Sequence, residues 1–205
     1  MPGLLFLRNV LLFSLAALVP ILLVYVSIIP GFASALIDGG PALSRFLRQV
    51  LTNGLPVVFV VNYVGFFLYA LSQDVHRSHR DPAVFLLLDF VVRITLFLFL
   101  HAIIYVLSAD WFGSFGGNRI TALRVVAPTL ARSALFENIS GVYLYATLVS
   151  AVPLYVSAIG RSPRLCPLAA AFPFQSGRIA IAVIWFVLAV VCLSLVSGFV
   201  AQLQN

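Results

Sequence analysis

Five side chains that can ionise or form strong hydrogen bonds interrupt otherwise apolar stretches of the sequence: Asn62, Asp89, Arg93, His101 and Glu137. Ionisable groups are costly inside a membrane, and where they occur they bind ions, relay protons or pair with one another. Asp89 and Arg93 are four residues apart, so in a helix they lie on one face and partly neutralise each other. If the five side chains met in space, they would form a polar track able to bind an ion or relay protons.

The same side chains also have a purely structural interpretation, which we favour. Asn62 and the Asp89–Arg93 pair would then hold neighbouring helices together, each contributing about 0.5–2 kcal/mol. Glu137 would lie at the membrane interface near the start of a helix, where the helix dipole favours a carboxylate. His101 lies three turns beyond Asp89, and helical geometry rotates its face away from that of Asp89.

The composition requires that helices in a membrane position these residues. The chain has 205 residues, of which 62% are hydrophobic and only 9% are charged. About a quarter of the residues of a soluble domain are charged, so a soluble enzyme, a disordered chain and a fibrous protein are excluded. We therefore predict an all-α fold, a polytopic helical bundle that forms a single membrane domain over residues 1–205.

Five apolar segments reach the roughly 20 residues that a helix needs to cross a hydrocarbon core of about 30 Å. Pro20 and Pro153 fall inside two of these segments and are expected to kink or interrupt them. The predicted spans are residues 9–29, 55–72, 84–109, 139–160 and 179–201.

Two connecting segments, 41–51 and 119–134, have the spacing of amphipathic helices. We expect the first to end at Asn53–Gly54 and to lie in the headgroup plane, with packing against a partner protein as an equal alternative. For the second we prefer an interfacial helix, and a short re-entrant segment is the alternative. The arginines expected to anchor these helices to lipid headgroups are Arg45, Arg48, Arg124 and Arg132.

The distribution of basic residues indicates a lipid environment rather than nucleic acid. The formal charge is +6 with 12 basic residues, all of them arginines spread over the connections instead of gathered on one face. Across five spans, six arginines fall on one side and five on the other, a slight imbalance that favours an N-terminus on the cytoplasmic side of a multi-pass protein. Ser194 and Gly198 form a small-xxx-small pair that would let the last span approach another helix closely.

No constellation of residues predicts catalysis. The chain has three histidines, and His76 and His79 lie in a short charged turn that we interpret as solvated rather than metal-binding. No second carboxylate faces Asp89, as intramembrane aspartyl chemistry would require. We predict no enzymatic activity, no cofactor and no metal.

Two functions remain open. The first is a non-catalytic subunit that packs in the bilayer against other transmembrane chains or against copies of itself. The alternative is a small oligomeric channel, or an ion- or proton-coupled transporter, that uses polar residues of the third and fourth spans.

Overall fold

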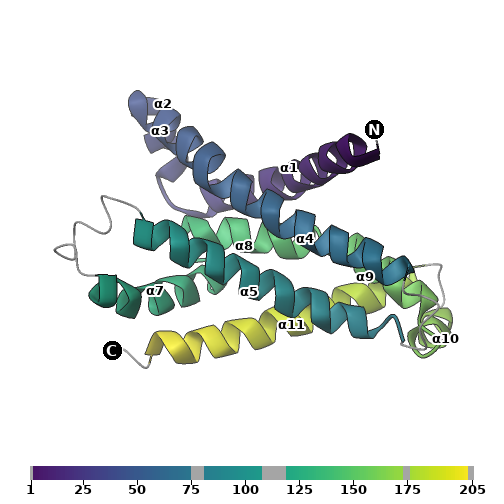
Figure 1. Cartoon of the computed structure of the whole chain (residues 1–205). Coiled ribbons are helices and arrows are strands. Elements are labelled where there is room, and N and C mark those ends of the chain that lie inside the picture. The colour runs from purple at the N-terminus through teal and green to yellow at the C-terminus, as the bar shows by residue number, and fades with distance from the viewer. Residues whose placement is uncertain (1, 75–80, 108–118, 173–175, 203–205) are drawn as a thin grey trace.

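The fold is all-α, as predicted, over the part of the chain that the computed structural model describes: residues 2–74, 81–107, 119–172 and 176–202. These ranges contain helices and no strands (Figure 1). The helices are α1 (Pro2–Ile28), α2 (Phe32–Asp38), α3 (Pro41–Gln49), a π-helical turn (Val50–Gly54), α4 (Leu55–Asp74), α5 (Val84–Leu107), α7 (Arg119–Ala134), α8 (Ile139–Val149), α9 (Val152–Arg161), α10 (Leu165–Ala170) and α11 (Gly177–Gln202).

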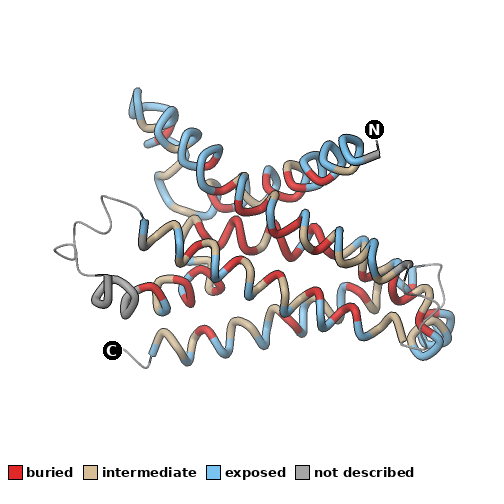
Figure 2. Tube along the Cα trace, in the orientation of Figure 1, coloured by how far each residue is buried: buried red, intermediate tan, exposed pale blue. Residues whose placement is uncertain are grey.

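Five helical segments of the described chain are long and apolar enough to cross a bilayer, which confirms the predicted polytopic bundle. The outward faces of α1 and α11 are largely exposed (Figure 2), and exposed apolar surface of this extent fits contact with hydrocarbon. The five segments are Gly3–Ile28, Pro41–Ser72, Val84–Tyr105, Ile139–Arg161 and Gly177–Gln202.

The segment made of α8 and α9 forms the centre of the bundle. In Ile139–Arg161, 61% of the apolar window is buried, against 11% in Gly177–Gln202. Helices α1, α4, α5 and α7 all pack against α8, whereas α11 packs against α7 and α9 at one edge (Figure 1). Polar residues on α8 are therefore enclosed by protein, while α11 presents most of its surface outward.

Helix α3 does not end at Asn53–Gly54, contrary to the sequence prediction. The π-helical turn Val50–Gly54 joins α3 to α4, so that helical structure is continuous from Pro41 to Asp74. Gly54 is required here for packing: a Cβ atom at this position would lie 2.1 Å from Cε1 of Tyr143. The glycine that looks like a helix stop instead admits an aromatic ring from α8.

Helix α7 packs beside α5 and α11, and its axis lies roughly along the bundle as theirs do (Figure 1). Its residues Val126, Leu130 and Ala134 are buried, and the turn that follows leads directly into α8. The interfacial helix that we preferred from the sequence and the re-entrant alternative both remain predictions for this segment.

Asp81 connects the start of α5 with the end of α9. Its Oδ1 accepts the backbone N–H of Ala83 at 2.9 Å, and Oδ2 lies 3.6 Å from Nε of Arg164. The adjacent Ser162 side chain, then the Ala83 N–H and more weakly the Arg164 charge, lower the pKa of Asp81 below its ordinary value of 3.8. The ionised carboxylate therefore stabilises this end of the bundle.

We predict a pH-dependent stability that depends on Asp81. Because its pKa is lower in the folded chain, its contribution is complete above pH 3.8 and is lost as the pH falls through the lowered pKa. Thermal unfolding in detergent should show Asp81→Asn less stable than the wild type at neutral pH, with the two midpoints converging as the pH falls below 3.8. Midpoints that fall in parallel over this range would contradict the assignment.

Candidate functional site

The charged pair predicted on the third span is completely buried. Asp89 and Arg93 lie on adjacent turns of α5, with Nε of Arg93 2.7 Å from Oδ2 of Asp89 and both side chains 0% exposed. A buried ion pair must recover the cost of desolvation through further hydrogen bonds. The other donors of Arg93 show where those bonds are made.

Arg93 links α5 to α4, α8 and α1. Its Nη1 donates to Oδ1 of Asn62 at 2.7 Å and to the backbone carbonyl of Thr147 at 3.0 Å. Nδ2 of Asn62 then donates to Oγ of Ser14 at 2.9 Å, which extends the network to α1. The structure thus brings together three of the five predicted polar residues, Asn62, Asp89 and Arg93, and adds Ser14 and Thr147.

The Thr147 carbonyl is available because the helix breaks between α8 and α9. In a continuous helix it would accept the N–H of Ala151, but that N–H donates to Leu148 at 3.1 Å instead. Pro153 follows the break and lacks a backbone N–H, so the next turn cannot repair it. The Ser150 hydroxyl, at the break, lies within hydrogen-bonding distance of Oδ1 of Asn62 and of the Thr147 carbonyl, and it can donate its one hydrogen to either. The backbone of α8 therefore supplies a main-chain ligand to the guanidinium.

Gly65 and Phe66 of α4 shape the space that Arg93 occupies. A Cβ atom at Gly65 would lie 2.2 Å from Nη2 of Arg93, so any larger residue would displace the guanidinium. The Cζ atom of Arg93 lies 5.6 Å from the centroid of the Phe66 ring, within range of a cation–π interaction. In the sequence Gly65 is one glycine among 13, and nothing marked it as part of this site.

A second polar group lies farther along the same helix interface. His101 of α5 is 3% exposed, and its ring centroid lies 6.1 Å from that of Tyr143 on α8. One turn on, the hydroxyl of Tyr105 is 2.8 Å from Oγ of Ser140. His101 therefore faces α8, as Arg93 does. Although the helix rotates His101 away from Asp89, His101 still contacts the same neighbouring helix, α8, as Arg93 does.

Together these residues form a polar stripe between α5 and the α8–α9 segment. We define the polar stripe as Asp89, Arg93, His101 and Tyr105 on one side and Ser140, Tyr143, Thr147, Ser150 and Tyr155 on the other. Phe97 divides it: this residue is 0% exposed, and its ring centroid lies 4.1 Å from that of His101. An apolar ring thus separates the Asp89–Arg93 half from the His101–Tyr143 half.

Two polar atoms of the stripe are buried without a hydrogen-bond partner: Nη2 of Arg93 and the hydroxyl of Tyr143. The Tyr155 hydroxyl and the Asp89 carboxylate instead interact with each other. Unpaired buried polar atoms are uncommon in native proteins and mark a place where strain, water or a proton is accommodated.

Glu137 does not join the stripe. It lies in the turn between α7 and α8 with its side chain 55% exposed, 4.0 Å from Nε of Arg132. The turn orients it outward because Phe136 adopts a φ of 61°, while the N–H of Glu137 bonds to the carbonyl of Arg132. The expectation of one track that contains Glu137 is therefore wrong.

The remaining predicted residues lie at the periphery. Arg45, Arg48 and Arg132 are exposed, as headgroup anchors would be, and the side chain of Arg124 lies outside the described residues. Ser194 interacts with the hydroxyl of Tyr145, while a Cβ atom at Gly198 would meet nothing within 4 Å. The small-residue surface at Gly198 is thus uncovered within the described chain.

Comparison with known proteins identifies no relative of this chain. No protein-family model, curated protein or solved structure matches the chain. In the part of the chain that the structure describes, no group of three or more His, Cys, Asp or Glu residues is arranged to hold a metal ion. His76 and His79 lie outside the described residues.

We predict that Asp89→Asn lowers the free energy of unfolding by about 3–5 kcal/mol, because it leaves the Arg93 charge buried without a counterion. The double variant Asp89→Leu with Arg93→Met removes both charges, so no unpaired charge stays buried, and it should lose less stability than Asp89→Asn alone. Unfolding in mixed micelles titrated with SDS, followed by circular dichroism, measures both values. A single variant as stable as the double variant would contradict the central role of the ion pair.

Proposed function

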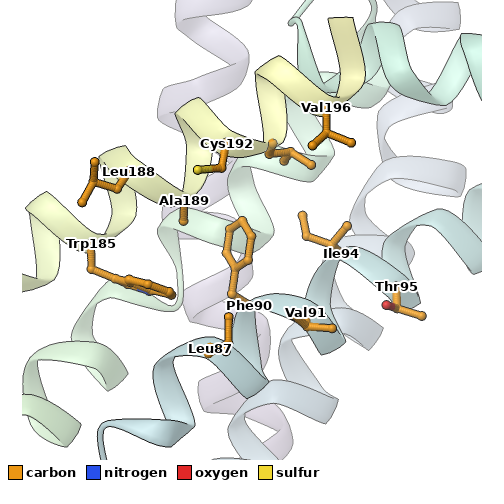
Figure 3. Close-up of a pocket in the computed structure, with 11 residues that line it drawn as sticks. Leu87, Phe90, Val91, Ile94, Thr95, Trp185, Leu188, Ala189, Cys192 and Val196 are labelled. Carbon is orange, nitrogen blue, oxygen red and sulfur yellow. The ribbon is translucent and has the colours of Figure 1, made fainter. Parts of the chain in front are cut away.

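We propose that the chain is a non-catalytic membrane subunit whose outer face receives a transmembrane helix of another chain. The observation that carries this proposal is an apolar groove between α5 and α11 (Figure 3). One part of it, of about 400 Å³, has Phe90 and Ile94 of α5 on one side and Ala189 and Cys192 of α11 on the other (Figure 3).

The groove continues along the bundle. A second cavity of about 570 Å³ is bounded by α5, α7 and α11 and shares Ile94, Leu193 and Val196 with the first. From Leu87 to Ala102 on α5, at 1.5 Å per residue, the two cavities extend over about 22 Å. This length is a large part of the hydrocarbon thickness, which suits an apolar helix lying along the groove.

The residues of the groove suit helix packing. Ala189, Cys192 and Ser197 present small side chains on α11, and small residues let the backbones of two membrane helices approach closely. The buried ion-pair network, in contrast, is enclosed by α1, α4, α5 and α8 and supports an internal structural role.

Filling the groove should release the partner. We expect Cys192→Trp to reduce stoichiometric co-purification of a membrane partner in mild detergent at least fivefold, because the indole occupies the space of the incoming helix. Leu195→Trp is the matched control, since Leu195 is 69% exposed and does not line the groove. A photo-crosslinker at position 192, but not at 195, should capture the same partner. A wild-type chain that purifies with no partner and gives no crosslink at 192 would contradict the proposal.

A second candidate function is an oligomeric channel or an ion- or proton-coupled transporter. The polar stripe supports it, because the stripe follows α5 from Asp89 to Tyr105 between the third and fourth spans. Carboxylate and imidazole groups at membrane depth are typical of proton relays.

Proton flux into liposomes separates the two candidates. If the stripe conducts, Asp89→Asn and the double variant Asp89→Leu/Arg93→Met should each slow flux at least tenfold, and Glu137→Gln should leave it unchanged because Glu137 lies outside the stripe. The double variant controls for folding, since it lacks the unpaired charge. Flux that is unchanged in both Asp89 variants, or wild-type flux equal to that of empty liposomes, would exclude the transport hypothesis.

A further inference from the structure

A separate pocket of about 530 Å³ lies at one end of the bundle and shares no lining residue with the groove. It is formed by the end of α1, the α2–α3 pair and the turn between α7 and α8. The residues that carry the argument are Tyr25, Phe32, Arg45, Phe46, Gln49 and Glu137.

The position of this pocket corresponds to headgroup depth. Tyr25 is in the last turn of the spanning helix α1, and Ile139, which also lines the pocket, is the first residue of α8. Helices α2 and α3 lie at the same end of α4 (Figure 1). The ends of spanning helices meet the polar interface of a bilayer, where aromatic and arginine side chains are enriched.

The pocket has an aromatic wall. The ring of Phe32 packs edge-to-face against Tyr25, with centroids 6.1 Å apart, and against Phe46, with centroids 5.5 Å apart. Leu36, which is buried, continues this apolar surface. The faces of aromatic rings attract ammonium groups, and the same wall gives apolar contact to the glycerol and upper acyl carbons of a lipid.

Opposite charges stand on the two sides of the pocket. Arg45 projects from α3, and its Nε donates weakly to the Pro41 carbonyl at 3.4 Å. Glu137 comes from the α7–α8 turn, lies 4.0 Å from Arg132, and has a side chain that is 55% exposed. In the described residues neither side chain forms an ion pair shorter than 4.0 Å. Each can therefore bind a ligand group of opposite charge.

The backbone conformation that orients Glu137 toward the pocket is energetically unfavourable. Phe136 is the one non-glycine residue with positive φ in the described chain, and this conformation costs about 1–2 kcal/mol. Its ring packs against Tyr25 at 5.6 Å and Tyr145 at 5.5 Å, which offsets the strain. Asn138 is occupied within the protein, because its side chain caps α8 and donates to the Thr129 carbonyl. Among the residues that line the pocket, Glu137 is therefore the one whose carboxylate can bind a positively charged ligand group.

We propose that this pocket binds the headgroup of a zwitterionic phospholipid, with its phosphate at Arg45 and its ammonium group between Glu137 and the aromatic wall. The Glu137 carboxylate disfavours an anionic lipid that lacks the ammonium group. The aromatic wall and Leu36 distinguish the site from one for free inorganic phosphate, which would gain nothing from apolar contact.

Lipid retention by the purified full-length chain tests this proposal. The chain is equilibrated in micelles that contain equal amounts of phosphatidylethanolamine, phosphatidylcholine and phosphatidylglycerol, exchanged into lipid-free detergent, and analysed for bound lipid by mass spectrometry. The wild type should retain a zwitterionic lipid at least fivefold over phosphatidylglycerol. A preference for phosphatidylethanolamine assigns the ammonium contact chiefly to Glu137, and one for phosphatidylcholine assigns it to the aromatic wall.

Two substitutions on the same helix make a matched comparison. Arg45→Gln should reduce retained zwitterionic lipid at least fivefold, while Arg48→Gln should not, because Arg48 is an exposed arginine of α3 that does not line the pocket. Glu137→Gln should remove the discrimination against phosphatidylglycerol. Retention of the three lipids in equal amounts by the wild type, or an equal loss in the Arg45 and Arg48 variants, would overturn the proposal.

Discussion

The structure depends on the burial of a guanidinium group inside an apolar bundle. Arg93 is 0% exposed, and it needs both a counterion and acceptors for its N–H groups. Asp89 supplies the charge, while Asn62 and the Thr147 carbonyl supply acceptors from two other helices. These requirements explain features that would otherwise be unrelated: the break between α8 and α9, the glycine at position 65, and the bond from Asn62 to Ser14 on α1. One side chain thereby fixes the relative positions of four helices.

The sequence predicts the helical spans well because hydropathy over about 20 residues is a direct signal of the solvent. It also predicts the Asp89–Arg93 pair, because four-residue spacing fixes two side chains on one helix face. It does not predict the Thr147 carbonyl, since a main-chain acceptor has no side-chain signature, although Pro153 marks the helix break nearby. The misplacement of Glu137 has a different cause: the left-handed conformation of Phe136 turns the chain outward, and phenylalanine gives no warning of it.

The position of His101 shows why a helical wheel misleads over long distances. Twelve residues separate it from Asp89, and a straight projection places the two on different faces. Residues 89, 93, 97, 101 and 105 nevertheless lie along a single i+4 row of α5, and such rows are inclined to the helix axis. Because α8 packs along this row, it meets Arg93 through Thr147 and His101 through Tyr143. The contact partner, rather than the wheel, decides which side chains share an interface.

The bundle is polar at its centre and apolar at its edge, which is the arrangement expected when the surrounding solvent is lipid. There is no hydrophobic gain in bringing two apolar helices together within hydrocarbon, so hydrogen bonds and close packing of small residues must hold them. The Arg93 network meets the first need inside α1, α4, α5 and α8, and the small residues of α11 offer the second at the surface. Because these two sets of contacts share no residue, the forces that fold the chain are separable from those that would recruit a partner helix.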